Sequence, residues 1–316
     1  MSITTWETRG RRTYVACPYV QDAIFILEIT PPGGPALQAR ARVIKTFKPF
    51  KACLVMRVAL EEVVSPPGAT LAQHGLPMDA VLKVYDHRFA TSERNFWNLK
   101  TFDPAYEAEY LAYVNGPFAA RTLAEISEEG NPKAMKYLNP NDDRHLLREH
   151  YLALTIASYF TSECNTYERL SSLQGREIPK FYGTIRFLGG EAAPNLDLTK
   201  PGILIEYIEG TPLIHAERGQ PNLEFLVKEC LGTVDMYSRL GVLNFGMRIE
   251  SFIVKPDGSG VVMIGLENSG IRPTEMSDDE WMNEKVAYDE EGEFAGRARE
   301  LWFLDFQYTY QWTKKD

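Results

Sequence analysis

Features that would mark a secreted or membrane protein are missing from this sequence of 316 residues. No apolar run approaches the roughly 20 residues needed to cross a bilayer. Residues 1–12 are polar and contain no hydrophobic signal core. We therefore expect a cytoplasmic or nuclear protein that is not secreted and has no membrane partner.

Cysteine is scarce, with four residues that are far apart in the chain. There is no C-x-x-C pair, and no histidine stands at ligand spacing from a cysteine. This pattern predicts reduced, buried thiols and no metal site. The cysteines are Cys17, Cys53, Cys164 and Cys230.

Basic clusters are missing as well. A nucleic-acid surface needs clustered lysine and arginine to neutralise phosphates, whereas this chain has a net charge of −9 and scattered basic residues. We therefore expect no nucleic-acid partner. The acidic segments 277–280 and 289–293 fit either a solvated helix face or a surface that attracts a basic partner.

Short apolar runs are present and predict strands. With 44% apolar and 12% aromatic residues, the chain can bury at least one large core. Residues 23–27, 40–45 and 52–58 are rich in apolar and β-branched side chains, which predicts a twisted antiparallel sheet. Residues 80–85 predict a further strand, and Lys83 is the one cation in its middle.

A polar and aromatic insert at about residues 90–150 follows these strands, with proline and glycine breakers between short helical stretches. Residues 150–173 then show apolar side chains at helical spacing, with Glu163 on or beside the apolar face. We expect a helix over about residues 150–174.

The remaining chain predicts apolar strands at 181–185 and 202–208, a helix at about 222–240 and a short strand at 261–264. This order indicates an α+β protein with two lobes. We place the first lobe at residues 1–205, with the insert and the 150–174 helix inside it, and a smaller, mostly helical lobe at 206–316.

Four motifs, in order over roughly 170 residues, resemble the protein-kinase-like fold. They are similar to those of kinase-like proteins of mushroom-forming fungi. The motifs are a Leu-Lys-Val-Tyr-Asp-x-Arg-Phe strand at 82–89, a Tyr-Glu-Arg-Leu-x-x-Leu-Gln-Gly helix end at 167–175, an Ile-Leu-x-Glu-Tyr-Ile-x-Gly hinge at 203–210, and a loop at 241–252.

The resemblance implies roles for four residues. Lys83 is similar to the strand lysine that reaches the nucleotide phosphates, and Glu163 to its helix partner. Glu206 and Ile208 lie in the segment whose backbone contacts adenine in active relatives. Three alternatives stay open: Lys83 as a surface residue of an edge strand, Glu168 as the rival partner, and the hinge as a plain connector. The resemblance also implies that Arg88 pairs with an acid of the insert.

The catalytic positions of the resemblance have lost their chemistry. Gly246 stands where the catalytic aspartate is expected, Ser251 where a metal-binding asparagine is expected, and Gly265 where the aspartate of Asp-Phe-Gly is expected. Glycine has no side chain that could hold Mg²⁺ or accept a proton. A slipped register could bring Glu267 to a metal, although its surroundings read as a turn.

A phosphate-binding glycine loop is also hard to find. The candidates are residues 31–35, whose prolines lack N–H groups, and residues 47–51, which contain no glycine.

These losses predict a catalytically inactive kinase-like protein, a pseudokinase, that acts as a binding, scaffold or regulatory module. The alternative is an enzyme of the same fold with non-standard chemistry or small-molecule phosphotransfer between its lobes. We expect no cofactor, although the sequence leaves open the binding of ATP or another nucleotide without metal. The partner, a protein or a small-molecule ligand, is not specified, and self-association is also left open.

Overall fold

The computed structural model describes residues 6–9, 12–117, 119, 145–191, 193, 195–306 and 312. The chain divides into two compact units, each of which is described by itself. The first comprises residues 1–160 and 182–204, and the second comprises residues 161–181 and 205–316.

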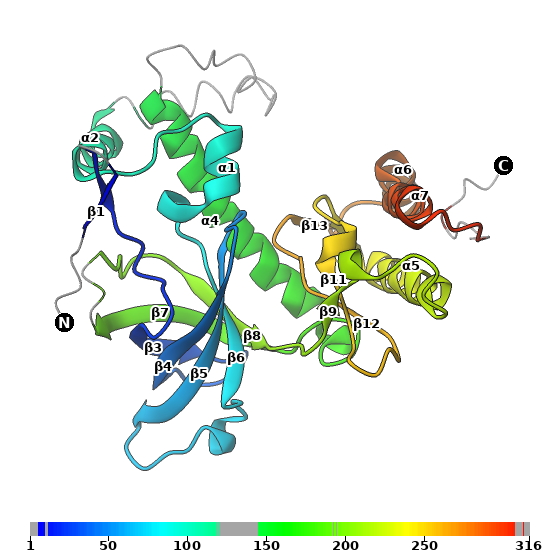
Figure 1. Ribbon diagram of the computed structural model, residues 1–316, viewed down its shortest axis with the longest axis horizontal. Helices are drawn as coiled ribbons and strands as arrows, with labels where there is room; N and C mark the ends of the chain where they lie inside the picture. Colours follow the sequence, from blue (N-terminus) through cyan, green and yellow to red (C-terminus); the bar gives the residue numbers. More distant parts are fainter. Residues whose placement is uncertain are drawn as a thin grey trace. The chain divides into compact units, whose positions relative to one another are not determined.

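A closed six-stranded barrel forms the first unit, in the order β3-β4-β5-β6-β8-β7 (Figure 1). Strands β3 to β6 follow the chain in antiparallel pairs, and β7 closes the barrel against β3. The strands are β3 (Ile24–Thr30), β4 (Leu37–Phe47), β5 (Leu54–Ser65), β6 (Asp79–Val84), β7 (Phe181–Glu191) and β8 (Gly202–Glu206).

Alternating burial explains why these segments form a barrel. In β3 every second side chain is buried, as expected for a strand with one face against a core. The same alternation occurs in the first part of β4 and β5. Strand β6 differs because all residues after Asp79 are buried, which is typical of a strand covered on both faces.

Outside the barrel, the described part of the first unit contains an N-terminal hairpin, β1 (Trp6–Arg9) and β2 (Arg12–Val15), and two helices of the insert. These are α1 (Thr91–Phe96) and α2 (Pro104–Val114). Helix α2 begins at Asp103, whose carboxylate accepts a hydrogen bond of 2.8 Å from the Tyr106 N–H. Helix α4 (His145–Arg169) begins in this unit and ends in the second.

Three helices and two small sheets form the second unit. Helix α5 (Leu223–Arg239) has nine buried residues along one stripe, which makes it the core helix. Helix α6 (Asp278–Tyr288) starts with a capping box between Ser277 and Glu280, and α7 (Glu290–Trp302) follows it directly. The sheets pair β10 (Val242–Asn244) with β13 (Ser269–Ile271), and β11 (Phe252–Val254) with β12 (Val261–Met263) and β9 (Thr211–Pro212).

One expectation from the sequence differs from this arrangement: residues 161–181, which were placed in the first lobe, belong with the second unit. There Ser162 Oγ donates to the Ser269 carbonyl, and Arg169 Nε donates to the Leu240 carbonyl at 2.5 Å. The expected turn is present at Glu267 and Asn268 and leads into β13, whose Ser269 pairs with Asn244. Much of the insert, residues 118 and 120–144, lies outside the described residues.

No helix within the described ranges has both the length and the apolar character that crossing a membrane requires. All four cysteines are free thiols, of which Cys53 and Cys230 are buried and Cys17 and Cys164 are half-buried, so the prediction that the thiols are buried is confirmed for two of the four. Burial raises the pKa of Cys17 to about 11 and that of Cys164 to about 12, which keeps both thiols protonated near neutral pH.

Candidate functional site

Lys83 lies inside the barrel sheet of the first unit. It is on β6, which has β5 on one side and β8 on the other, and it pairs with Val55 of β5. Only 4% of Lys83 is exposed, so its interpretation as a surface residue of an edge strand is wrong. Because burial of an unpaired ammonium group is unfavourable, its position demands a polar environment.

Glu163 lies on the part of α4 that belongs to the second unit, and it is fully buried. Glu168, the rival candidate on the same helix, is exposed to solvent. Tyr167 and Leu170, which were expected on the inward face with Glu163, are also fully buried. Burial therefore favours Glu163 as the glutamate with a specific role, and its pairing with Lys83 stays a prediction.

The structure brings together the three positions that lack catalytic groups. Gly246 follows β10, Ser251 precedes β11 and Gly265 follows β12. The Ile264 N–H donates to the Ser251 carbonyl at 2.7 Å, which fastens the loop after β12 to the loop before β11. A Cβ atom placed on Gly265 would lie 3.1 Å from Ser251 Oγ. These positions therefore form one site.

Asn244 organises this site, and we did not identify it from the sequence. Its Nδ2 donates to the Gly265 carbonyl at 2.6 Å, and its Oδ1 accepts from the Gly246 N–H at 2.9 Å. One buried amide side chain thus connects two of the three altered positions. The signal was an asparagine two residues before Gly246, a spacing typical of an Asx turn.

A buried ion cluster holds the beginning of this loop. Glu290 Oε1 accepts from the Asn244 N–H at 2.8 Å and from the Tyr237 hydroxyl at 2.6 Å. Glu290 Oε2 accepts from Lys285 Nζ at 2.5 Å, and Lys285 also donates to Glu291 at 3.2 Å. Burial and the neighbouring Glu290 raise the pKa of Tyr237 well above its ordinary value. Glu290 therefore holds the backbone of Asn244, at the beginning of the loop, through a charge-assisted hydrogen bond.

A metal site is not evident among the residues that the structure describes, since no group of three histidine, cysteine, aspartate or glutamate side chains is arranged to hold an ion. Glu267, the candidate for a relocated site, is half-buried, and its Oε2 lies 4.0 Å from where a Gly265 Cβ would be. Asn268 lies against Gly246, with its Cβ 3.3 Å from the position of a Gly246 Cβ. A side chain at 246 or 265 would therefore meet neighbours that already fill the space.

The hinge residue Glu206 is used to anchor a neighbouring segment. Its N–H donates to the Lys180 carbonyl at 2.8 Å, and its Oε2 accepts from the Lys180 N–H at 3.0 Å. Ile208 is half-buried beyond the end of β8. This double contact fits a connector, while adenine contacts of Glu206 and Ile208 stay a prediction.

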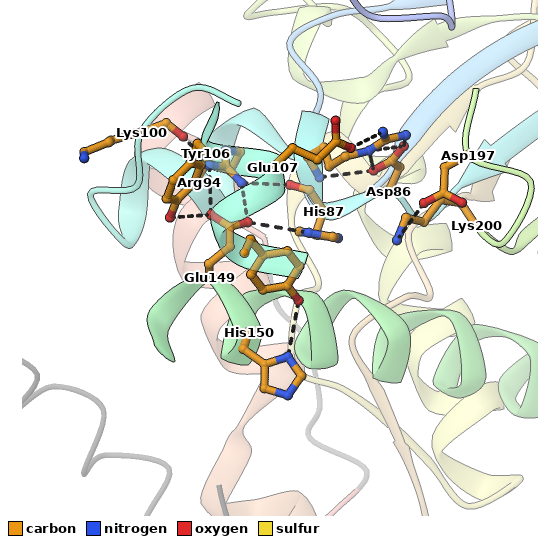
Figure 2. A network of polar contacts seen from close by, with 12 residues as sticks. Asp86, His87, Arg94, Lys100, Tyr106, Glu107, Glu149, His150, Asp197 and Lys200 are labelled. Atoms are coloured by element: carbon orange, nitrogen blue, oxygen red, sulfur yellow. Dashed lines mark hydrogen bonds and ion pairs between the residues drawn. The ribbon is translucent and has the colours of Figure 1, made fainter. Parts of the chain in front are cut away.

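A separate polar network in the first unit is built on the residues after β6. Asp86 is fully buried and accepts from Arg88 Nη2 at 2.7 Å and from the Tyr19 hydroxyl at 3.1 Å. Arg88 Nη1 donates to Glu107 of α2 at 3.0 Å (Figure 2). The predicted pairing of Arg88 with an acid of the insert is confirmed.

Glu149 of α4 forms the second half of this network. It accepts from Arg94 Nη1 at 2.6 Å and Nη2 at 3.0 Å, and from the Tyr106 hydroxyl at 3.2 Å (Figure 2). Burial raises the pKa of Glu149 even though Arg94 opposes the shift. His87 Nε2 lies 3.6 Å from Glu149 Oε1 and has no hydrogen-bond partner among the residues that the structure describes. Burial, with Lys200 and the nearby arginines, holds the pKa of His87 well below its ordinary value.

Comparisons with known proteins find no match in sequence and partial alignments with solved structures. No family model matches the chain, and no curated protein matches it. Among solved structures, 79% of the chain aligns with 64% of "PpkA-294 apo form" at 9% identity and a TM-score of 0.38. A second alignment also includes 79% of the chain and covers 51% of a rhoptry kinase from Toxoplasma gondii, at 8% identity and a TM-score of 0.37. The chain thus spans about two thirds and one half of these two chains.

Proposed function

We propose that this protein is a catalytically inactive kinase-like protein, a pseudokinase, that acts as a binding, scaffold or regulatory module. The observation that carries the proposal is the convergence of Gly246, Ser251 and Gly265 at one site. A kinase needs a base for the acceptor hydroxyl and two metal-holding side chains at such a site. Neither of the two glycines can supply one, and a single serine hydroxyl is a poor substitute.

The order of two buried ionisable residues along the chain supports the kinase-like assignment. In protein kinases the phosphate-binding lysine is on a strand of the N-terminal sheet, and its glutamate is on the helix that follows. Here β6 carries Lys83 and the long helix α4 carries Glu163, in the same order along the chain. The assignment thus rests on position and burial, since both residues are at most 4% exposed.

The turn between β4 and β5 supports a weak or absent nucleotide site. It spans residues 48–53 and contains no glycine, unlike the phosphate-covering loop of a kinase. Its Phe50 is 7% exposed and packs in the barrel core, and the Phe50 carbonyl accepts from the Ser92 N–H at 3.1 Å. The turn is therefore packed as part of the barrel. We propose that the protein needs no cofactor, and that any nucleotide binds without metal.

Two measurements test the proposal. Thermal unfolding is followed with ATP alone and with ATP plus Mg²⁺ or Mn²⁺, and we expect no metal-dependent rise in Tm. Phosphate release and autophosphorylation are measured alongside, with Lys83→Met as the control variant. Turnover that Lys83→Met abolishes contradicts the proposal, and a metal-dependent shift contradicts the loss of both metal ligands.

A second function, phosphotransfer or other chemistry on a small molecule, is favoured by one observation. Lys83 and Glu163 are ionisable residues in buried positions, where ionic groups destabilise a protein unless they are paired. If they act on a ligand, Lys83→Met and Glu163→Gln should each weaken binding of a nucleotide analogue in calorimetry. If they are only structural, the two variants lower the free energy of unfolding, and neither the wild type nor the variants bind the analogue.

A further inference from the structure

A groove of about 580 Å³ lies in the second unit, between the loop that contains Gly246 and helix α7. Its apolar side chains include Ile214, Met247, Phe294 and Leu301. Phe294 is buried and packs on Phe252 with ring centroids 5.4 Å apart, which gives the groove a firm floor. Leu301 is 41% exposed and offers an apolar wall to whatever enters.

Two glycines of α7 help to create the groove. Gly292 and Gly296 are one helical turn apart and both line it. A Cβ atom added to Gly296 would meet nothing within 4 Å, so the space above this residue is open. Glycine is unfavourable inside a helix and is the residue that allows another backbone to approach closely. The helix surface is therefore shaped for contact with a chain rather than for internal packing.

Charge at the rim of the groove favours a basic occupant. Glu250 and Glu293 line it from opposite sides, and neither forms an ion pair with a residue that the structure describes. Arg297 is bridged to Glu300 at 3.5 Å, which leaves Arg248 as the remaining cation of the lining. Two carboxylates thus face one guanidinium, in a chain whose net charge is −9.

We propose that this groove binds an extended segment of a partner protein that has an apolar side chain followed within a few residues by a lysine or arginine. The apolar side chain packs between Met247 and Leu301, and the cation lies between Glu250 and Glu293. Gly296 allows the backbone of the segment to run against α7. The inference rests on the proposed binding function and names the class of its partner.

A peptide library tests the proposal directly. The probe is a positional-scanning library of fluorescein-labelled ten-residue peptides, and its binding to the full chain is measured by fluorescence anisotropy. We expect selection for leucine or methionine at one position and for lysine or arginine within three residues of it. The Glu250→Gln and Glu293→Gln variants should each weaken the selected peptide by about two- to fivefold, as exposed ion pairs do.

A matched pair of glycine variants provides the control. Gly296→Leu fills the groove and should weaken binding by about tenfold or more, while helix formation is favoured by the replacement of glycine. Gly232 of α5 is also helical with nothing within 4 Å of an added Cβ, so Gly232→Leu should leave binding unchanged. Circular dichroism of both variants establishes that they fold.

Three results overturn the proposal: no selected peptide, selection of acidic residues, or equal loss of binding in both glycine variants. Sedimentation of the free protein tests whether a second copy of the chain occupies the groove instead. Dimers that dissociate in the Gly296→Leu variant would show that it does. None of these results depends on phosphotransfer. Failure here is therefore distinct from failure of the proposed inactivity, which the ATP and Mg²⁺ measurements decide.

Discussion

Two polar regions of this protein have opposite contents. The network around Asp86 and Glu149 in the first unit is dense in buried charges, and Arg88 and Arg94 compensate its carboxylates. The site around Gly246 and Gly265 in the second unit is instead held by the amide side chain of Asn244, which bonds to the backbone of both glycines. Since buried charges need partners to be tolerated, the first region is built for stability. The second is linked by hydrogen bonds of an uncharged side chain.

Both regions nevertheless contain a buried ion cluster. In the second unit, Lys285, Glu290 and Glu291 are each at most 4% exposed. Their role there is to hold the backbone of Asn244, so charge is retained where it supports the loop. Gly246 and Gly265, by contrast, have no ionisable side chain.

The largest effect is expected from removal of Glu149. Glu149→Ala leaves the guanidinium of Arg94 buried, with only carbonyl acceptors from His87 and Lys100. Loss of one partner of a buried pair typically costs about 3–5 kcal/mol. Urea unfolding should show a decrease of this size in the free energy of unfolding. Glu168→Ala, on the exposed side of the same helix, is the control and should change it by less than about 0.5 kcal/mol.

A smaller effect is expected in the second unit. Glu290→Gln removes the charge that accepts hydrogen bonds from Asn244, Tyr237 and Lys285, which should cost about 2 kcal/mol. Glu291→Gln should cost less than about 1 kcal/mol, because burial already raises the pKa of Glu291 and Lys285 keeps Glu290 as its partner. Chemical denaturation of both variants measures the difference. Equal losses would show that the two carboxylates share the work of holding Lys285.

His87 should make stability depend on pH. Its folded pKa is lowered by burial and by the cations around it, so the unfolded chain binds the extra proton first. Its contribution is fully present above the unfolded pKa of about 6.5 and is lost as pH falls, by up to about 1.4 kcal/mol per pH unit. Relative to wild type, His87→Gln should therefore lose less stability between pH 7 and 5.

The exposed His215 provides the control for this titration. His215→Gln should follow the wild-type curve of unfolding free energy against pH. If His87→Gln also follows the wild-type curve, the protonation of His87 does not differ between the folded and unfolded states. The pH dependence would then belong to the carboxylates of the network.

The smallest effect concerns the empty positions themselves. Gly265→Ala places a Cβ atom 3.1 Å from Ser251 Oγ, and we expect a loss of about 1 kcal/mol from overpacking. Gly296→Ala, in open space on α7, should instead gain about 0.5–1 kcal/mol from helix propensity. Thermal unfolding of the two variants measures opposite shifts in Tm. A gain for Gly265→Ala would mean that the site has room for a side chain.

Elements with strong local patterns could be predicted from the sequence. The strands β3, β4 and β6 and helix α5 were expected within a few residues of their observed bounds, because their apolar pattern is clear. Strand β5 was expected at 52–58 and continues to Ser65. The short strands β9, β10 and β11 were not expected. Strands of two or three residues carry too little pattern to be recognised. Strands β9 and β10 form with partners that are distant in the chain, β11 and β13, which supply their hydrogen bonds.

The residues of the candidate site divide in the same way. The sequence identified Lys83 as unusual, because a cation in an apolar strand is costly. It also identified Gly246, Ser251 and Gly265, through their places in the motifs. Asn244 and Glu290 could not be singled out, because an asparagine or a glutamate acquires such a role only from the groups that surround it in three dimensions.

The sequence by itself determined that positions 246 and 265 have no ionisable side chain, since a glycine lacks a carboxylate in any fold. It also determined the barrel strands, whose alternation of apolar and polar residues is a local property of the chain. Only the tertiary structure decided that the three altered positions form one site, and that Asn244 and a buried ion cluster hold it. Hydrogen bonds between residues that are distant in the chain depend on how its segments pack, and packing cannot be read from any one segment.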